Sequence, residues 1–186
     1  MKAKTSRMAL SIIWSRLARA QDYARANRDQ MMDNAMRQVL HTIGTGRETR
    51  RVDCHHNFTE REVHDGREVW VTRKGAIRAD IGDLGVIPGS MGTRSYIVTG
   101  LGNEASWTSC AHGAGRRLSR TKAKKLFTTE DLTAQMDGKV WLAARAAALV
   151  DEIPSAYKDI DQVMADQADL VEIRHTLHQV LNYKGT

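Results

Sequence analysis

Apolar residues recur at helical spacing over the first part of the chain. Residues 5–43 contain no glycine or proline, and two apolar patches flank the mostly polar stretch 19–30. The patches are Leu10, Ile13, Trp14 and Leu17, then Met31, Met32, Ala35, Met36, Val39 and Leu40. This pattern predicts two helices or one long bent helix, closed by Gly44 and Gly46. Methionines at this spacing are typical of core packing.

The next stretch changes to the alternation of β-strands. His64-Asp65-Gly66 predicts a hairpin turn between strands at 59–63 and 68–72. Glycines are dense between residues 82 and 92, where we expect a shaped loop instead of a regular element. A short strand is predicted at 95–98, ending at Gly100.

The second half alternates between helical and extended patterns. We predict a basic helix at 119–127, a further short helix capped by Thr128 or Thr129, and helices at 139–151 and 160–168. The period-two pattern of residues 170–182 favours a strand, although a helix is compatible with the same residues. No repeat or linker divides the sequence, so a single domain is expected.

Composition and charge favour a folded protein with an anionic partner. Of the 186 residues 41% are hydrophobic and 27% are charged, which is typical of globular proteins. The net charge of +6 favours a polyanion as partner, although a basic face is often only solvated. The two cysteines form no disulfide framework, and no apolar run reaches the length of a membrane span. We therefore expect a soluble cytoplasmic protein that does not contact a membrane.

The strongest candidate for chemistry is the segment 109–120. His112 stands directly before Gly113-Ala114-Gly115, and Arg116, Arg117 and Arg120 follow. Glycines let an anion approach the backbone N–H groups, and guanidinium groups match phosphate oxygens. A neutral imidazole in this setting could attack phosphorus and hold the phosphoryl group as a phosphoramidate. The alternative is a glycine-rich loop before a basic helix, with a solvated histidine.

Three weaker motifs accompany this segment. Residues 53–57 concentrate potential metal ligands, but neighbours on a strand face opposite ways, so only one of His55 and His56 can share a site with the rest. The loop 86–95 is a glycine-flanked hydroxyl cluster that could bind phosphate through backbone N–H groups and serines. Residues 154–158 offer a tyrosine and a lysine that could contact a base, or a tyrosine packed at a helix end.

Taken together, these segments resemble the C-terminal part of the RtcB family of RNA ligases. The matching motifs occur in the family's order and cover almost the whole chain, most loosely over the first helical region. They are His56-Asn57, Arg73-Lys74-Gly75-Ala76, Ile87-Pro88-Gly89-Ser90-Met91-Gly92-Thr93, Ser95-Tyr96, His112-Gly113-Ala114-Gly115-Arg116, Ser119-Arg120, Ala156-Tyr157-Lys158 and Lys184-Gly185.

The resemblance implies an α+β fold with a mixed sheet and flanking helices, of which this chain is the C-terminal part. One domain would span 1–186, with a helical region at 1–46 and a nucleotide-binding and catalytic segment at 47–186. The implied activity is a GTP- and Mn²⁺-dependent ligase that joins RNA 3′-phosphate or 2′,3′-cyclic phosphate ends to 5′-hydroxyl ends, as in tRNA splicing and RNA repair.

The resemblance also implies roles for particular residues. His112 would be the guanylylated histidine, and His56 a metal ligand. The nucleotide contacts would be Asn57, Pro88, Gly89, Ser90, Met91, Ser95, Gly113, Ala114, Gly115, Tyr157 and Lys184. Tyr157 and Lys184 would lie on the guanine side. Weaker candidates for contacts with RNA phosphates are Arg116, Arg120 and Lys124.

The sequence departs from the family in its metal ligands. The family's segments Asn-Cys-Gly, Gly-Asn-His and His-Thr-Gly-Ser-Arg-Gly, which supply further ligands, do not occur here. With His56 as the only matched ligand, we expect a fragment that is inactive alone and pairs with an N-terminal chain or with itself. Alternatives are a non-catalytic module that binds nucleotide or RNA, with strong salt dependence, and a structural remnant.

Overall fold

A computed structural model of the chain describes residues 7–184, with side chains from residue 12 onward. Leu10 of the first apolar patch and Gly185 of the last matching motif therefore lie outside the described side chains and residues. The chain divides into two compact units between Arg51 and Val52. Each unit is described by itself.

The first unit is built on one long helix. Helix α1 runs without interruption over Arg7–Ile43, which decides between the two predicted arrangements. Gly44 follows with φ of 78° and donates its N–H to the carbonyl of Leu40 at 2.9 Å, so the predicted glycine closure is confirmed. Beyond it, Arg51 binds Asp33 and Glu48, each at 2.7 Å, and thereby ties the chain back to the helix.

Helix α1 carries several exposed apolar side chains. Ile12, Ile13, Met31 and Met32 are 47, 54, 62 and 43% exposed, whereas Trp14 is half-buried. The methionines therefore do not fill a core, contrary to the prediction from their spacing. The helical pattern was interpreted correctly, but spacing alone does not state whether a partner covers the apolar face.

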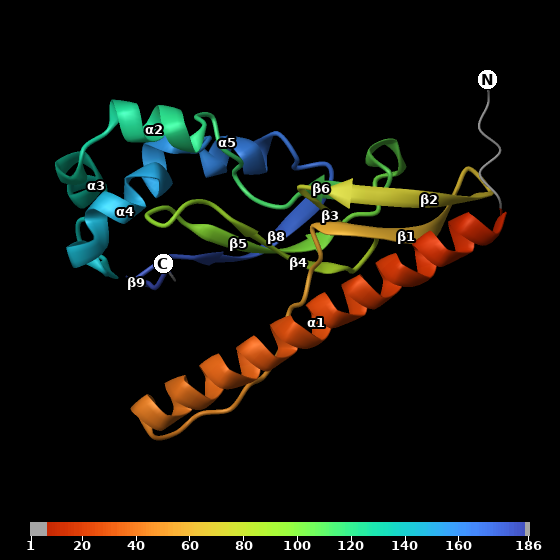
Figure 1. Cartoon of the computed structure of the whole chain (residues 1–186), viewed down its shortest axis with the longest axis horizontal. Coiled ribbons are helices and arrows are strands. Elements are labelled where there is room, and N and C mark those ends of the chain that lie inside the picture. Colours follow the sequence, from red (N-terminus) through yellow and green to blue (C-terminus); the bar gives the residue numbers. More distant parts are fainter. Residues whose placement is uncertain (1–6, 185–186) are drawn as a thin grey trace. The chain divides into compact units, whose positions relative to one another are not determined.

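The second unit contains nine short strands among its described residues (Figure 1). They are β1 (Asn57–His64), β2 (Arg67–Lys74), β3 (Ala76–Arg78), β4 (Leu84–Pro88), β5 (Ser95–Gly100), β6 (Ser109–Ala111), β7 (Val140–Trp141), β8 (Val171–Leu177) and β9 (Leu181–Asn182). Strands β1 and β2 form the predicted hairpin. Asp65 and Gly66 turn it with φ of 51° and 71°, the positive values that a two-residue hairpin turn requires.

The remaining strands pair in three small sheets. β3 pairs with β6, and β5 lies between β4 and β8, all antiparallel, while β7 and β9 are parallel. Together with the helices they confirm the α+β class. The strand β8 also settles residues 170–182 in favour of an extended structure.

The prediction of an irregular loop over the glycine-rich residues 82–92 was wrong in part. Leu84–Pro88 forms β4, and Gly85 lies inside it. A Cβ atom at Gly85 would come within 2.6 Å of Ile77 Cδ1. The glycine is therefore explained by close packing between strands, which glycine density along a sequence does not distinguish from a loop.

Short helices follow in the second half. They are α2 (Arg120–Leu126), α3 (Thr129–Gln135), α4 (Ala146–Leu149) and α5 (Ile160–Ala165), with one-turn 3₁₀ helices at Glu104–Ser106, Ala143–Arg145, Val150–Glu152 and Pro154–Ala156. Ser119 caps α2. Of the two predicted candidates it is Thr128 that caps α3, where it forms a capping box with Asp131. The predicted helix at 139–151 is broken, because Val140 and Trp141 are paired with β9 instead.

Two hydrophobic cores support the second unit. One lies among β3–β6, β8 and α5, and includes Ile77, Ile87, Tyr96, Val98, Cys110, Ile160 and Met164. The other lies among α2, α3 and α4, which gather at one end of the unit in Figure 1, and includes Ala123, Leu132, Met136, Leu149 and Ile153. Tyr157 packs against both. Within residues 7–184, none of the helices has the length and apolar character to cross a membrane.

The exposed apolar side chains of α1 generate a prediction about association. Patches of this kind are uncommon on stable monomers, so we expect the chain to form a dimer or larger species in sedimentation at micromolar concentration. Replacing Ile13 and Met31 by lysine is expected to shift it toward the monomer, while the control Arg37→Lys leaves the distribution unchanged. A wild-type monomer would contradict this account.

Candidate active site

The candidate site is organised by Gly75, which lies between β2 and β3. Its N–H donates to the carbonyl of His56 at 2.8 Å, and its own carbonyl lies 2.6 Å from His112 Nδ1. Its φ of 73° is in the left-handed region, and a Cβ atom would lie 3.5 Å from His112 Cε1. One residue therefore joins two segments that are far apart in the sequence.

The rings of His56 and His112 stack on one another. Their centroids are 5.0 Å apart, and the ring planes differ by 12°. His112 is half-buried, whereas His56 and the neighbouring Asn57 are exposed. The structure thus brings together the residues that the family resemblance links to the nucleophile, the metal and the nucleotide.

The contact with Gly75 fixes the tautomer of His112. A carbonyl oxygen can only accept a hydrogen bond, so Nδ1 carries the proton. In the neutral ring the lone pair then resides on Nε2. This is the arrangement that a nucleophilic imidazole needs.

The predicted nucleotide loop packs against the histidine segment. Ala114 donates its N–H to the carbonyl of Pro88 at 3.0 Å, and a Cβ atom on Gly113 would lie 3.0 Å from the same oxygen. Ser90 and Ser95 are buried, and the side chain of Met91 belongs to the core among the helices. Ser90, Met91 and Ser95 can therefore make polar contacts to a nucleotide only through their backbone atoms and the two serine hydroxyls.

The loop 86–95 uses several of its N–H groups in hydrogen bonds within the loop itself. Gly89 donates to the carbonyl of Arg94 at 3.1 Å, and Ser90 donates to Thr93 Oγ1 at 2.6 Å. In the histidine segment, by contrast, the backbone N–H groups of Gly113 and Gly115 have no acceptor among residues 7–184. The donors suited to an anion therefore lie beside His112.

The cationic residues after His112 surround two buried carboxylates. Arg120 Nη1 lies 2.7 Å from Asp151 Oδ2 and 2.6 Å from Glu152 Oε1, and Lys124 Nζ lies 3.5 Å from Asp151 Oδ1. Arg116 donates to the backbone carbonyl of Asp151 at 2.5 Å. The three candidates for RNA contacts thus come together, but each also has a partner within the protein.

Tyr157 and Lys184 meet at the same cluster. The Tyr157 hydroxyl donates to Glu152 Oε2 at 2.5 Å, and Lys184 Nζ lies 2.6 Å from that oxygen. The guanidinium of Arg116 covers the Tyr157 ring at 4.8 Å. Burial, followed by the adjacent Glu152, raises the pKa of Tyr157. The tyrosine is thus both packed and within a cationic site.

The ligand-rich segment 53–57 gives no metal cluster. Residues 53–56 precede β1, so the alternation of strand faces does not apply to them. His55 Nε2 lies 3.8 Å from Asp53 Oδ2 and its ring faces Phe58, while His56 faces His112. In the described part of the chain, no three histidine, cysteine, aspartate or glutamate side chains are placed to hold one metal ion.

A buried ion pair attaches the hairpin to the strand that leads to His112. Arg73 is 3% exposed, binds Glu62 with both Nη atoms, and donates from Nε to Ser109 Oγ at 2.9 Å. His64 Nε2 lies 2.7 Å from Glu62 Oε2. Burial would raise the pKa of Glu62, but hydrogen bonds from Arg73 and His64 lower it to about 2.

Sequence reasoning gave no role to four of these residues: Gly75, Arg73, Asp151 and Glu152. Gly75 and Arg73 belong to the motif Arg73-Lys74-Gly75-Ala76, which matches the family. The match marks these residues as candidates, but it does not indicate what either residue does. Asp151 is the last residue of the helix predicted at 139–151, and Glu152 follows it directly. Only the packing shows that their carboxylates are buried.

Comparison with known proteins decides the family. The family model described as "tRNA-splicing ligase RtcB" matches residues 6–185. The chain belongs to the RtcB family. It is 51% identical over 178 residues to "RNA-splicing ligase RtcB" of Escherichia coli K12 and 35% identical over 176 residues to "tRNA-splicing ligase RtcB" of Nanoarchaeum equitans.

These RtcB relatives are considerably longer than the matched part. The alignment with the E. coli relative covers 91% of this chain and 42% of that protein. For the N. equitans relative the shares are 80% and 36%. The chain thus spans less than half the length of the curated relatives it matches.

The Arg73–Glu62 pair of this RtcB family member generates a prediction about stability. Glu62 has a lower pKa in the folded chain than its unfolded value of about 4.3, so its ionisation stabilises the fold above that pH. The contribution is lost as pH falls from there toward 2. We expect Glu62→Gln to lower the free energy of unfolding by about 3 kcal/mol at pH 7 and by much less at pH 3.

Urea unfolding at the two pH values measures this difference. The control Glu68→Gln removes an exposed carboxylate of the same hairpin that pairs with Arg61. It is expected to change stability little. Equal stability of wild type and Glu62→Gln at pH 7 would show that the buried pair contributes nothing.

Proposed function

We propose that this chain provides the nucleotide-binding and nucleophilic part of a GTP-dependent RNA ligase. The ligase would join RNA 3′-phosphate or 2′,3′-cyclic phosphate ends to 5′-hydroxyl ends. The observation that carries the proposal is the contact between His112 Nδ1 and the Gly75 carbonyl, which leaves the lone pair of the neutral ring on Nε2. The names of the relatives support the class of activity.

In the proposed first step, His112 Nε2 attacks the α-phosphorus of GTP. The Nε2–phosphorus bond forms, the bond from that phosphorus to the bridging oxygen breaks, and pyrophosphate leaves with the bonding electrons. The ring gains positive charge as the bond forms. The Gly75 carbonyl, 2.6 Å from Nδ1, favours this charge because it accepts the Nδ1 proton in a hydrogen bond.

In the later steps GMP passes from the histidine to the RNA 3′-phosphate, and the RNA 5′-hydroxyl displaces it. The N–H groups of Gly113 and Gly115 are suited to phosphate oxygens. Four cationic side chains, Arg116, Arg120, Lys124 and Lys184, surround the two carboxylates of Asp151 and Glu152. The cluster keeps a surplus of positive charge, which supports binding of an RNA backbone.

The residues described here do not by themselves fit a Mn²⁺ site. His56 is the matched ligand, and no three-donor group surrounds it in residues 7–184. A stable site for such an ion needs several nitrogen or oxygen ligands. We expect the remaining metal ligands to come from residues other than these.

The N–H groups of Gly113 and Gly115 and the cationic cluster also support a second candidate function, a module that binds a nucleotide or RNA without catalysis. It would use the same glycine N–H groups and cationic cluster. A structural remnant without ligand is the third alternative. Adduct formation on His112 separates the ligase from both.

The test is formation of a GMP adduct, measured by intact-protein mass spectrometry. Given GTP and Mn²⁺ alone, the chain is expected to form little adduct. When the portion of the E. coli relative that this chain does not match is added as a separate chain, we expect the adduct to appear on this chain. It should be lost in His112→Ala and retained in the control His175→Ala, which changes an exposed histidine of β8.

Each outcome has a clear meaning. An adduct that persists in His112→Ala would refute the assigned nucleophile. GTP binding without an adduct in any mixture would favour the binding module. A stoichiometric adduct on the chain alone would contradict the expected need for further metal ligands.

A further inference from the structure

Glu152 is a buried carboxylate to which the proposed chemistry assigns no step. It ends the 3₁₀ helix Val150–Glu152 and is 3% exposed. Its Oε2 atom accepts from the Tyr157 hydroxyl at 2.5 Å and lies 2.6 Å from Lys184 Nζ. Its Oε1 atom lies 2.6 Å from Arg120 Nη1. Desolvation of a buried carboxylate is costly and is offset only by close ion pairs and hydrogen bonds such as these, so the loss of one partner affects the others.

The partners keep Glu152 ionised. Burial raises the pKa of this carboxyl group, but the hydrogen bonds from Lys184 and Tyr157 outweigh burial, and the pKa is lowered. Replacing the glutamate by glutamine would remove the charge while keeping the size of the side chain. The lysine and the tyrosine would then lose their common anchor.

Lys184 depends on this anchor for its position. It lies beyond β9, and its side chain is 40% exposed. A lysine side chain has a flexible four-carbon stem, so an exposed ammonium group samples many positions. The ion pair with a buried carboxylate selects one of them. An ammonium group has three N–H donors, so donors remain for a further acceptor after one binds Glu152.

Tyr157 is fixed by the same carboxylate from the other side. Its hydroxyl donates to Glu152 and accepts from Arg116 Nη1 at 3.1 Å. Arg116 also covers its ring. Glu152 therefore fixes the positions of Tyr157 and Lys184 relative to each other. These are the two residues that the proposed function places on the guanine side of the nucleotide.

We propose that Glu152 is a positioning and specificity-determining residue, which holds Lys184 and Tyr157 so that the site prefers guanine over adenine nucleotides. The inference rests on the proposed function. Guanine presents two acceptors, N7 and O6, along one edge, whereas adenine presents the N6 amino donor in place of O6. A fixed ammonium group matches the guanine edge and is opposed by the amino group of adenine.

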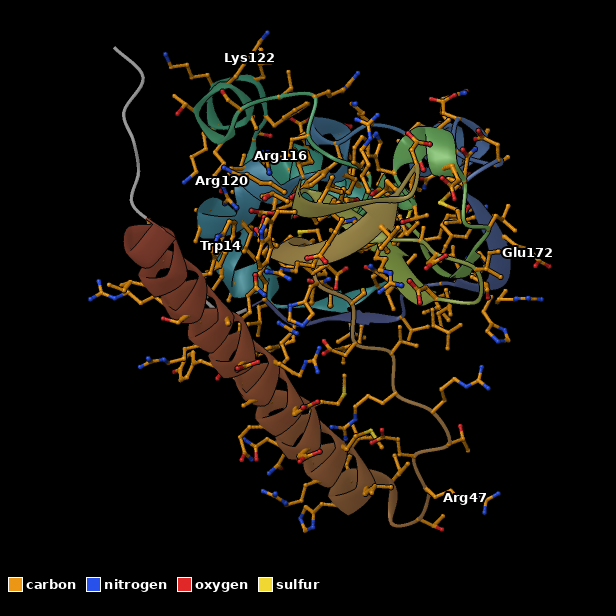
Figure 2. The ribbon with its side chains drawn as sticks, turned by 90° about the vertical axis from the view of Figure 1, so that its right-hand side faces the viewer. Trp14, Arg47, Arg116, Arg120, Lys122 and Glu172 are labelled. Atoms are coloured by element: carbon orange, nitrogen blue, oxygen red, sulfur yellow. The ribbon has the colours of Figure 1, made fainter. Side chains whose placement is uncertain are left out.

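The experiment compares binding of GTP and ATP by the full chain and its variants. In Glu152→Gln we expect the Kd for GTP to rise roughly tenfold, while the Kd for ATP changes less than about twofold. The matched control is Glu172→Gln. Glu172 is an exposed carboxylate of β8 that pairs with Arg174, on the side of the unit opposite Arg116 and Arg120 in Figure 2. Its removal should leave both constants unchanged.

A second measurement tests the contact without any nucleotide. Because Glu152 contributes to the raised pKa of Tyr157, Glu152→Gln should lower this pKa in an ultraviolet titration. The difference between wild type and Tyr157→Phe assigns the signal. Should Glu152→Gln fail to fold, Glu152→Asp replaces it, because the shorter side chain keeps the charge but withdraws the carboxylate from Lys184 and Tyr157. The same loss of GTP preference is expected.

The outcomes separate this inference from the proposed function. An unchanged preference for GTP in Glu152→Gln, an equal loss for both nucleotides, or an unchanged titration of Tyr157 overturns the positioning role. Failure of the wild-type chain to bind GTP contradicts the proposed nucleotide site, and this inference falls with it. Binding by wild type with no effect of the variant refutes only the inference.

Discussion

The geometry of the candidate site depends on the backbone of Gly75. In its left-handed conformation the carbonyl of Gly75 accepts a hydrogen bond from the imidazole of His112, while its N–H donates to the carbonyl of His56. A residue with a side chain would be strained at this φ, and its Cβ atom would contact the His112 ring. The stacking of the two rings and the tautomer of His112 both follow from this one residue.

The histidine segment runs across the junction of the two hydrophobic cores. Ala114 belongs to the core among the strands, while Leu118 packs against the core among the helices. Between them Gly115 accepts from the N–H of Lys158 at 3.0 Å, and Arg117 donates to the carbonyl of Ala156 at 2.9 Å. The nucleophile is thus supported on one side by sheets, and the cationic cluster on the other by α2 and the 3₁₀ helices. The buried acids Asp151 and Glu152 gather the cations at this second side.

Local signals predicted much of the fold, while the contacts between distant segments required the structure. The turn at Asp65-Gly66, the cap Thr128 and the strand at 171–177 follow from propensities that act within a few residues. Gly85 was wrongly assigned to a loop, because the need for glycine there comes from the close approach of Ile77 on β3, a strand of another sheet. The helix expected at 139–151 failed for a similar reason, since Val140 and Trp141 pair with residues some forty positions later. At the site, motif resemblance selected His56 and His112, but only packing shows that their rings stack and that Glu152 joins Tyr157 to Lys184.

The proposed role of His112 as the nucleophile depends on which of its ring nitrogens carries the proton, and nuclear magnetic resonance measures this directly. Long-range ¹H–¹⁵N correlation spectra of the imidazole rings, recorded near pH 8 and assigned with His112→Ala, distinguish the two neutral tautomers. We expect His112 to carry its proton on Nδ1, with Nε2 giving the signal of an unprotonated nitrogen. A His112 ring protonated on Nε2 would contradict the hydrogen bond to Gly75 and, with it, the assignment of this residue as the nucleophile.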